Sequence, residues 1–190
     1  MARTYIQDIT FDKIDFSKEP LQQADYENCT FINCELANYD LSGISFIECS
    51  FTGSNLSTAK LKKTAFRDTL FKDSKLMGLQ FGECDAFLFT VNFENCMLNF
   101  SSFYKMKLKK LVFKNCNLAE ADFTEADLSL SVFDNCNLLK ALFENTILEK
   151  ADFRTSYNYS IDPQINKIKK AKFSLAGVAG LLDKYDIELE

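Results

Sequence analysis

Residues 113–133 read FKNCNLAEADFTEADLSLSVF, and a large apolar residue stands at every fifth position of this stretch. The same interval extends from Leu88 to Phe153, with Leu and Phe alternating. A second run with this interval extends from Phe11 to Phe81. The two runs differ in phase by two residues, which predicts a small insertion near residues 83–88. An interval of five fits neither an α-helix nor an ordinary strand, whose periods are about 3.6 and 2.

The residue two positions before each of these centres is mostly small, and all seven cysteines fall on this phase. The other three positions of each five carry nearly all the charge, so two residues in five are expected to point inward. Asn95-Cys96, Asn115-Cys116 and Asn135-Cys136 recur at a constant interval of four five-residue steps. This longer period predicts a coil of four five-residue sides, with Asn at corners because Asn tolerates left-handed backbone. The chain would then form about seven stacked coils, as in other solenoids.

Three segments carry a resemblance to a known family. Ala121-Asp122-Phe123-Thr124-Glu125, Ala126-Asp127-Leu128-Ser129-Leu130 and Ala151-Asp152-Phe153-Arg154-Thr155 match the motif A-[DN]-[LF]-x-x. The chain resembles the pentapeptide-repeat family over roughly residues 4–175. The resemblance implies an all-β fold, a right-handed quadrilateral β-helix of about seven coils, with a short C-terminal helix.

The repeat divides the chain into three expected regions. Residues 1–155 are expected to form the β-helix, with the register break near residues 83–88. The repeat fails over residues 156–170, which we expect to form a loop, and returns at Ala171-Lys172-Phe173. In residues 171–190 this last repeat precedes an amphipathic helix over Ser174–Tyr185, with Ser174 as N-cap, and a terminal strand over Asp186–Glu190.

This ending resembles that of the quinolone-resistance branch of the family. The resemblance implies a homodimer joined through the C-terminal segment, and a partner such as DNA gyrase or topoisomerase IV. Members of this branch mimic duplex DNA and protect the enzyme from fluoroquinolones. The candidate dimer interface comprises the apolar residues of the segment: Leu175, Val178, Leu181, Leu182 and Ile187. The segment could also cap the open end of the coil, and capping is compatible with dimerisation.

The net charge of −5 is distributed in bands along the sequence. Residues 1–58, 76–104 and 115–155 are net acidic, whereas residues 59–75 and 105–114 are net basic. DNA mimicry requires ordered negative charge, so the candidate partner surface comprises Glu120, Asp122, Glu125, Asp127 and Asp134. It also includes Phe87 and Phe89, which lie off the central phase beside the register break and either pack locally or form an exposed patch.

The lysines at 60–63 and 105–114 could bind nucleic acid, but they lack interleaved aromatic residues and the sequence pI is near 4.9. Direct nucleic-acid binding is therefore disfavoured.

The composition argues against an enzyme. The chain has no histidine, which removes Ser-His-Asp and Cys-His nucleophile pairs, and it has no phosphate-binding glycine motif. The seven cysteines could indicate a redox or metal site, but their inward phase favours core packing. We expect no cofactor, no metal, no membrane span and a cytoplasmic location. The alternative to a topoisomerase-binding protein is a β-helical scaffold or regulator with another, unidentified protein partner.

Overall fold

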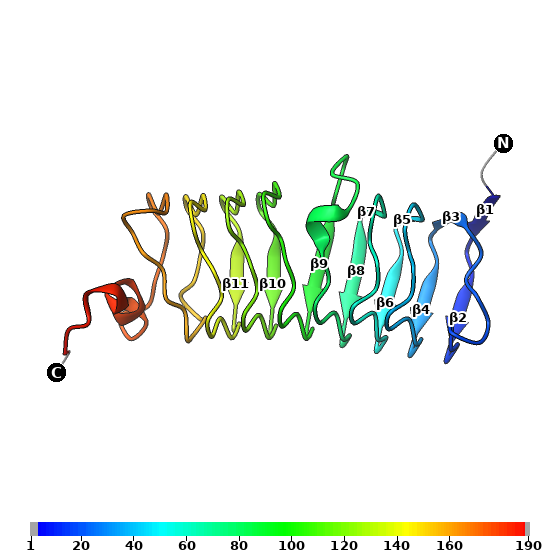
Figure 1. Ribbon diagram of the computed structural model, residues 1–190, viewed down its shortest axis with the longest axis horizontal. Coiled ribbons are helices and arrows are strands. Elements are labelled where there is room, and N and C mark those ends of the chain that lie inside the picture. The colour runs from blue at the N-terminus through cyan, green and yellow to red at the C-terminus, as the bar shows by residue number, and fades with distance from the viewer. Residues whose placement is uncertain (1–3, 189–190) are drawn as a thin grey trace. The chain divides into compact units, whose positions relative to one another are not determined.

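The computed structural model describes residues 4–188, and short parallel strands alternate with turns at regular intervals until the C-terminal segment (Figure 1). The chain divides into two compact units, Met1–Met97 and Leu98–Glu190. In both units a residue pairs with the residue that lies one coil further along the chain. At nearly every pair, from Thr4 with Ala24 to Asp152 with Lys172, the offset equals four five-residue sides, as the longer sequence period predicts.

The first unit has strands on two sides of its coil. One sheet has the order β1-β3-β5-β7, formed by Thr4–Gln7, Ala24–Glu27, Ser45–Ile47 and Ala65–Arg67. Parallel strands on the second side follow one another from β2 (Thr10–Asp12) through β4 (Thr30–Ile32), β6 (Ser50–Thr52) and β8 (Thr69–Lys72) to β9 (Val91–Glu94). The remaining sides are held by single bridges, such as Glu35 with Asn55.

The second unit has one parallel strand pair, β10 (Val112–Lys114) with β11 (Val132–Asp134). Its other sides are joined by isolated bridges in the same parallel register, including Asp122 with Leu142 and Asp127 with Ile147. Each five-residue side is short, because the chain must turn a corner before a longer ladder can form.

The core of each unit consists of columns of stacked side chains at the central positions. In the first unit the rings of Phe31 and Phe51 are parallel within 9°, with their centroids 4.5 Å apart. In the second unit Phe133 and Phe153 stack at 4.6 Å. These separations match the spacing of about 4.8 Å between neighbouring strands, so each ring contacts the equivalent ring of the next coil.

The small residues two positions before the centres are also buried, and their polar atoms bond between coils. The hydroxyl groups of Ser54 and Thr146 donate to the carbonyl oxygens of Phe31 and Phe123, at 3.1 and 2.9 Å. Cys136 has the same geometry, with its thiol 3.4 Å from the carbonyl oxygen of Phe113. All cysteines are free, and all but Cys84 are buried. The prediction that they pack in the core is confirmed for these six.

The corners of the coil have left-handed backbone. Asn95, Asn115 and Asn135 have φ angles of 55°, 53° and 51°, which confirms the prediction that this Asn column lies at corners. The corner side chains also bond to one another, because the Asn135 amide donates to Asn115 Oδ1 at 2.9 Å. A positive φ angle is strained for a residue other than glycine, and the side-chain hydrogen bonds between corners offset part of this strain.

The register break is an insertion of two residues between β8 and β9. Phe71 pairs with Phe93, whereas the regular offset would pair it with Val91, and the additional residues follow the 3-10 helix η1 (Phe81–Glu83). Leu88, which the sequence pattern predicted as the first core position of the second run, is 62% exposed with φ of 56°. That prediction was wrong, because Phe89 is the residue that packs near the core here, 6.5 Å from Phe66.

The prediction of a loop over residues 156–170 was also wrong. Parallel bridges join Tyr157 to Asn137 and Lys167 to Ile147, so the coil continues through this segment. Tyr159 and Ile161 are buried, and Asn166 replaces the usual small residue. The Asn166 amide donates to the carbonyl oxygen of Phe143 at 2.7 Å, the bond that a Ser or Thr makes elsewhere. The sequence pattern fails here because different residue types perform the same packing.

The C-terminal segment forms two short 3-10 helices, η2 (Val178–Leu181) and η3 (Asp183–Tyr185), instead of the single predicted helix. Ser174, the predicted N-cap, closes the turn that precedes η2, since its hydroxyl oxygen accepts the N–H of Gly177 at 3.0 Å. The N-cap of η2 is Gly177, which makes no side-chain capping bond, so the predicted cap was wrong. Residues 186–188 contain no strand, contrary to the predicted terminal strand, and residues 189–190 lie outside the described part. A continuous helix is opposed by Gly177 and Gly180, which both approach Tyr159 closely.

Candidate functional site

The insertion creates a loop, residues 84–90, which projects from the coil next to η1 (Figure 1). Backbone hydrogen bonds fix its base, from Asp85 N to Thr64 O at 2.9 Å and from Thr90 N to Phe66 O at 3.0 Å. The Asp85 carboxylate also accepts the N–H of Phe87 at 2.9 Å. The insertion loop is therefore a defined turn that raises its central residues above the surface.

The two candidate phenylalanines of this loop have different environments. Phe87 is 67% exposed, and Arg67 lies over its ring at 5.6 Å from the centroid. Phe89 is half-buried and contacts Phe81 edge to face at 6.2 Å. With Leu88, Phe87 forms an exposed apolar tip of a kind that commonly marks a protein interface. The structure thus separates Phe87, which is available to a partner, from Phe89, which anchors the loop.

The acidic candidates of the second unit lie on sides that bring lysines close to them. Glu125 is 3.5 Å from the Lys105 ammonium and 3.3 Å from the Tyr104 hydroxyl, and Asp127 is 3.3 Å from Lys109. Partial burial raises the pKa of Asp127, but hydrogen bonds from Ser129 and Lys109 outweigh it and hold this pKa below its ordinary value. The basic band at 105–114 therefore neutralises part of the acidic band that follows it in sequence.

The other three acidic candidates are not neutralised in this way. Asp122 accepts the Thr124 N–H at 2.9 Å, and Asp134 accepts the Thr155 hydroxyl at 3.0 Å. Glu120 is exposed at a corner with φ of 58° and makes no ion pair with a described residue. Their negative charge faces solvent, with Glu120 the most accessible.

The C-terminal candidates differ strongly in exposure. Leu175 is 94% exposed, Val178 43% and Ile187 54%, whereas Leu181 and Leu182 are half-buried. The first three leave an apolar surface open on the segment, and the last two hold the segment against the coil. Leu182 and Ile187 also line a cavity of about 240 Å³ with Ala179, Asp183 and Asp186.

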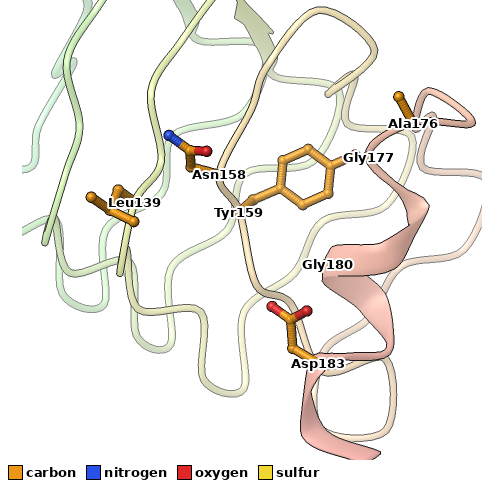
Figure 2. A pocket seen from close by; sticks show the side chains of 7 residues that line it. All are labelled: Leu139, Asn158, Tyr159, Ala176, Gly177, Gly180 and Asp183. Carbon is orange, nitrogen blue, oxygen red and sulfur yellow. The ribbon is translucent and has the colours of Figure 1, made fainter. Parts of the chain in front are cut away.

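A larger cavity, of about 350 Å³, lies between this segment and the coil. Figure 2 shows its lining of Leu139, Asn158, Tyr159, Ala176, Gly177, Gly180 and Asp183. Tyr159 Oη is buried, and this burial raises the pKa of the hydroxyl, although the nearby Ser174 side chain lowers it in part. Leu139, which lies on the other side of Figure 2 from the C-terminal segment, is 48% exposed. The segment therefore covers the coil incompletely and leaves apolar surface on both sides of the cavity.

No group of three or more His, Cys, Asp or Glu side chains is placed to hold a metal ion within residues 4–188. No helix of that same part of the chain is long and apolar enough to cross a membrane.

Comparison with known families identifies the repeat. The profile of the pentapeptide repeat region matches residues 19–87 and 86–159, which is more than half of the chain. The chain belongs to the pentapeptide-repeat family. The chain has the right-handed quadrilateral β-helix that the family resemblance implied, with about seven coils.

Solved structures of pentapeptide-repeat proteins match nearly the whole chain. A trypsin-treated variant of QnrB1, a plasmid-mediated fluoroquinolone resistance protein, is 18% identical with a TM-score of 0.51, covering 99% of this chain and 98% of that one. Full-length QnrB1 is 19% identical with a TM-score of 0.49, covering 96% and 100%. HetL, involved in heterocyst differentiation regulation in the cyanobacterium Nostoc, is 14% identical with a TM-score of 0.41, covering 91% and 87%. A search of curated protein sequences found no match. The likeness to the trypsin-treated QnrB1 variant, at a TM-score of 0.51 and 18% identity, supports the fold alone.

Sequence reasoning missed several exposed apolar residues of this pentapeptide-repeat protein. Leu139, Leu142 and Tyr157 lie at outward positions and are about half exposed. The five-residue phase could have identified them, because it assigns these large apolar residues to outward positions, where they cannot pack in the core.

Proposed function

We propose that this chain is a non-enzymatic interaction protein that binds a type II topoisomerase, DNA gyrase or topoisomerase IV, and changes its sensitivity to fluoroquinolones. The observation that carries the proposal is the insertion loop, which holds Phe87 at 67% exposure on an otherwise regular coil. Exposed aromatic residues on a fixed loop are typical anchors of protein interfaces. The proposal also draws on the fluoroquinolone resistance named for QnrB1, which has the same fold. It requires a cytoplasmic chain, because these topoisomerases act on chromosomal DNA.

The acidic candidates supply the DNA-like part of the proposed interface. Glu120, Asp122 and Asp134 present negative charge without an ion pair to a described lysine or arginine. A positively charged DNA-binding groove would attract such a surface at long range, and salt would weaken the attraction. In this proposal the carboxylates orient the protein and Phe87 supplies most of the affinity.

The test is a gyrase supercoiling assay with and without ciprofloxacin, titrated with this protein. We expect the protein to restore supercoiling in the presence of the drug, or to inhibit gyrase alone. Phe87→Ala should weaken either effect by roughly tenfold or more, because loss of an interface anchor costs about 2 kcal/mol. Phe100→Ala is the matched control, since Phe100 is a 53% exposed phenylalanine off the central phase that belongs to the other unit.

The absence of any effect of the unmodified protein on gyrase or topoisomerase IV would contradict the proposal. Equal losses in Phe87→Ala and Phe100→Ala would remove the specific role of the loop. If the unmodified protein has no effect on either topoisomerase, the alternative function applies, which is a β-helical scaffold or regulator with another protein partner. The ion pairs of Lys105 with Glu125 and Lys109 with Asp127 favour this alternative, because they make that surface less like DNA.

We further propose that two copies associate through the C-terminal segment. Leu175 at 94% exposure and Ile187 at 54% are apolar residues that a second copy would cover. The cavities beside the segment, of about 240 and 350 Å³, provide space for side chains of the partner. Under this proposal the segment both closes the end of the coil and forms the dimer contact.

Leu175→Glu should convert the dimer to a monomer in sedimentation velocity, because two introduced carboxylates would be buried near the symmetry axis without partners. Leu130→Glu is the control. Leu130 is an exposed corner residue with φ of 64°, and Glu120 and Glu125 already adopt this corner conformation. A monomeric unmodified protein would refute the dimer, and equal dissociation of both variants would place the contact elsewhere.

A further inference from the structure

A groove of about 610 Å³ lies on the outer surface of the first unit, below the insertion loop. It is lined by Asp25, Ser45, Lys63, Ala65, Arg67, Cys84, Asp85 and Ala86. Asp25, Ser45 and Ala65 lie opposite one another on the paired strands β3, β5 and β7. The small side chains of Ser45 and Ala65 leave space at outward positions, where other coils carry longer residues.

Arg67 enters this groove with unused hydrogen-bonding capacity. Its Nε is buried and has no hydrogen-bond partner, although the side chain as a whole is 27% exposed. Its Nη2 is 3.9 Å from the Asp85 carboxylate, which is beyond hydrogen-bond distance. A buried donor on a charged group is costly when it is unpaired, so a native structure normally supplies an acceptor for it.

Other donors surround the same space. Lys63 lines the groove and makes no ion pair with a described residue. The Ser45 side chain lines the floor and is 8% exposed. The Phe87 ring faces the guanidinium, whose central carbon is 5.6 Å from the ring centroid. A planar guanidinium whose Nε has no partner in the protein suits two-point binding of a carboxylate or a phosphate.

We infer that this groove binds a small oxyanion, a phosphate or carboxylate group, between Arg67 and Lys63. Binding turns the Arg67 side chain, so that its Nε, which is buried and unpaired in the unliganded protein, donates to one oxygen and the neighbouring guanidinium N–H donates to a second. Asp25 and Asp85 also line the groove, so its formal charge is balanced and affinity depends on directed hydrogen bonds. We therefore expect weak, saturable binding. The inference is independent of the proposed topoisomerase partner.

The test is an NMR titration of the full chain, labelled with ¹⁵N, with sodium phosphate in one arm and sodium acetate in the other. Ionic strength is held constant with sodium chloride. We expect saturable amide shifts confined to residues 63–67 and 84–87, in one arm or in both. Response to phosphate alone identifies a phosphoryl ligand, whereas response to acetate identifies a carboxylate as a sufficient ligand.

Arg67→Gln should weaken this binding at least tenfold. Lys62→Gln removes the same charge from an exposed neighbour that does not line the groove, and should leave binding unchanged. Arg67→Lys keeps the charge but removes the planar donor edge, so it should also bind weakly and provides a second variant if Arg67→Gln does not fold. Shifts that do not saturate in either arm, or that are equal in Arg67→Gln, Arg67→Lys and Lys62→Gln, would overturn the inference.

Discussion

Phe123→Asp is expected to prevent folding of the second unit. Phe123 is fully buried and stacks between Phe103 and Phe143, at 5.1 Å from each ring. Removal of a buried phenylalanine costs about 3 to 5 kcal/mol, and an unpaired buried carboxylate adds several more. The free energy of unfolding of a domain is only about 5 to 15 kcal/mol, so this substitution removes most or all of it. Far-UV circular dichroism and urea unfolding would measure the loss.

Asp122→Ala is the control for this substitution, one residue away in the chain. Asp122 is half-exposed, and its carboxylate accepts only the Thr124 N–H at 2.9 Å and the Ser102 hydroxyl at 3.3 Å. Loss of these bonds should cost about 1 kcal/mol or less. Similar unfolding curves for Phe123→Asp and Asp122→Ala would mean that the assignment of inward and outward positions is incorrect.

The five-residue period could specify most of this fold because a single pattern sets packing and topology together. A column such as Phe113, Phe133 and Phe153 forms only if each coil contains four complete five-residue sides, so the period in the sequence directly gives the register. The same period gave the inward phase of the buried cysteines and the corners at Asn115 and Asn135. Solenoids allow this inference because each coil contacts only its neighbours.

The pattern was insufficient where other residues replace those of the repeat. Leu88 has the correct spacing for a core position, but the insertion turns it outward and Phe89 packs in its place. In the coil at residues 156–170, Asn166 makes the hydrogen bond that Ser or Thr makes elsewhere. Spacing alone cannot identify these cases, because they depend on which neighbouring side chain fills a particular space.

For the candidate interaction residues, the residue types could be predicted from the sequence, but the contacts that each residue makes could not. The sequence indicated acidic residues and off-phase phenylalanines, but it could not pair Lys105 with Glu125 across one coil or separate Phe87 from Phe89. Those relations depend on corner geometry and on the direction of the insertion loop. The groove beside Arg67 could not be predicted for the same reason, since its lining comes from the three paired strands β3, β5 and β7 and from residues 84–86 of the next coil.

Gly180→Val is expected to detach the C-terminal segment while the rest of the second unit remains folded. A Cβ at Gly180 would overlap the carbonyl oxygen of Tyr159, and backbone cannot move aside as a flexible side chain can. The Gly180 carbonyl also accepts the N–H of Ile161 at 2.9 Å, so displacement breaks this bond and exposes Tyr159 and Ile161, which are now buried. We expect a loss of about 3 kcal/mol, near the upper end for overpacking. Urea unfolding would measure this loss, and limited proteolysis would show cleavage within residues 174–188.

Ala176→Val adds a similar branched side chain to the same segment and is the control for Gly180→Val. Ala176 is exposed at the margin of the cavity in Figure 2, so the larger side chain can extend into solvent and should change stability little. If the segment also forms the dimer contact, Gly180→Val should be monomeric and Ala176→Val should retain the dimer. Wild-type resistance to proteolysis in Gly180→Val would show that the close approach of Gly180 to Tyr159 does not hold the segment in solution.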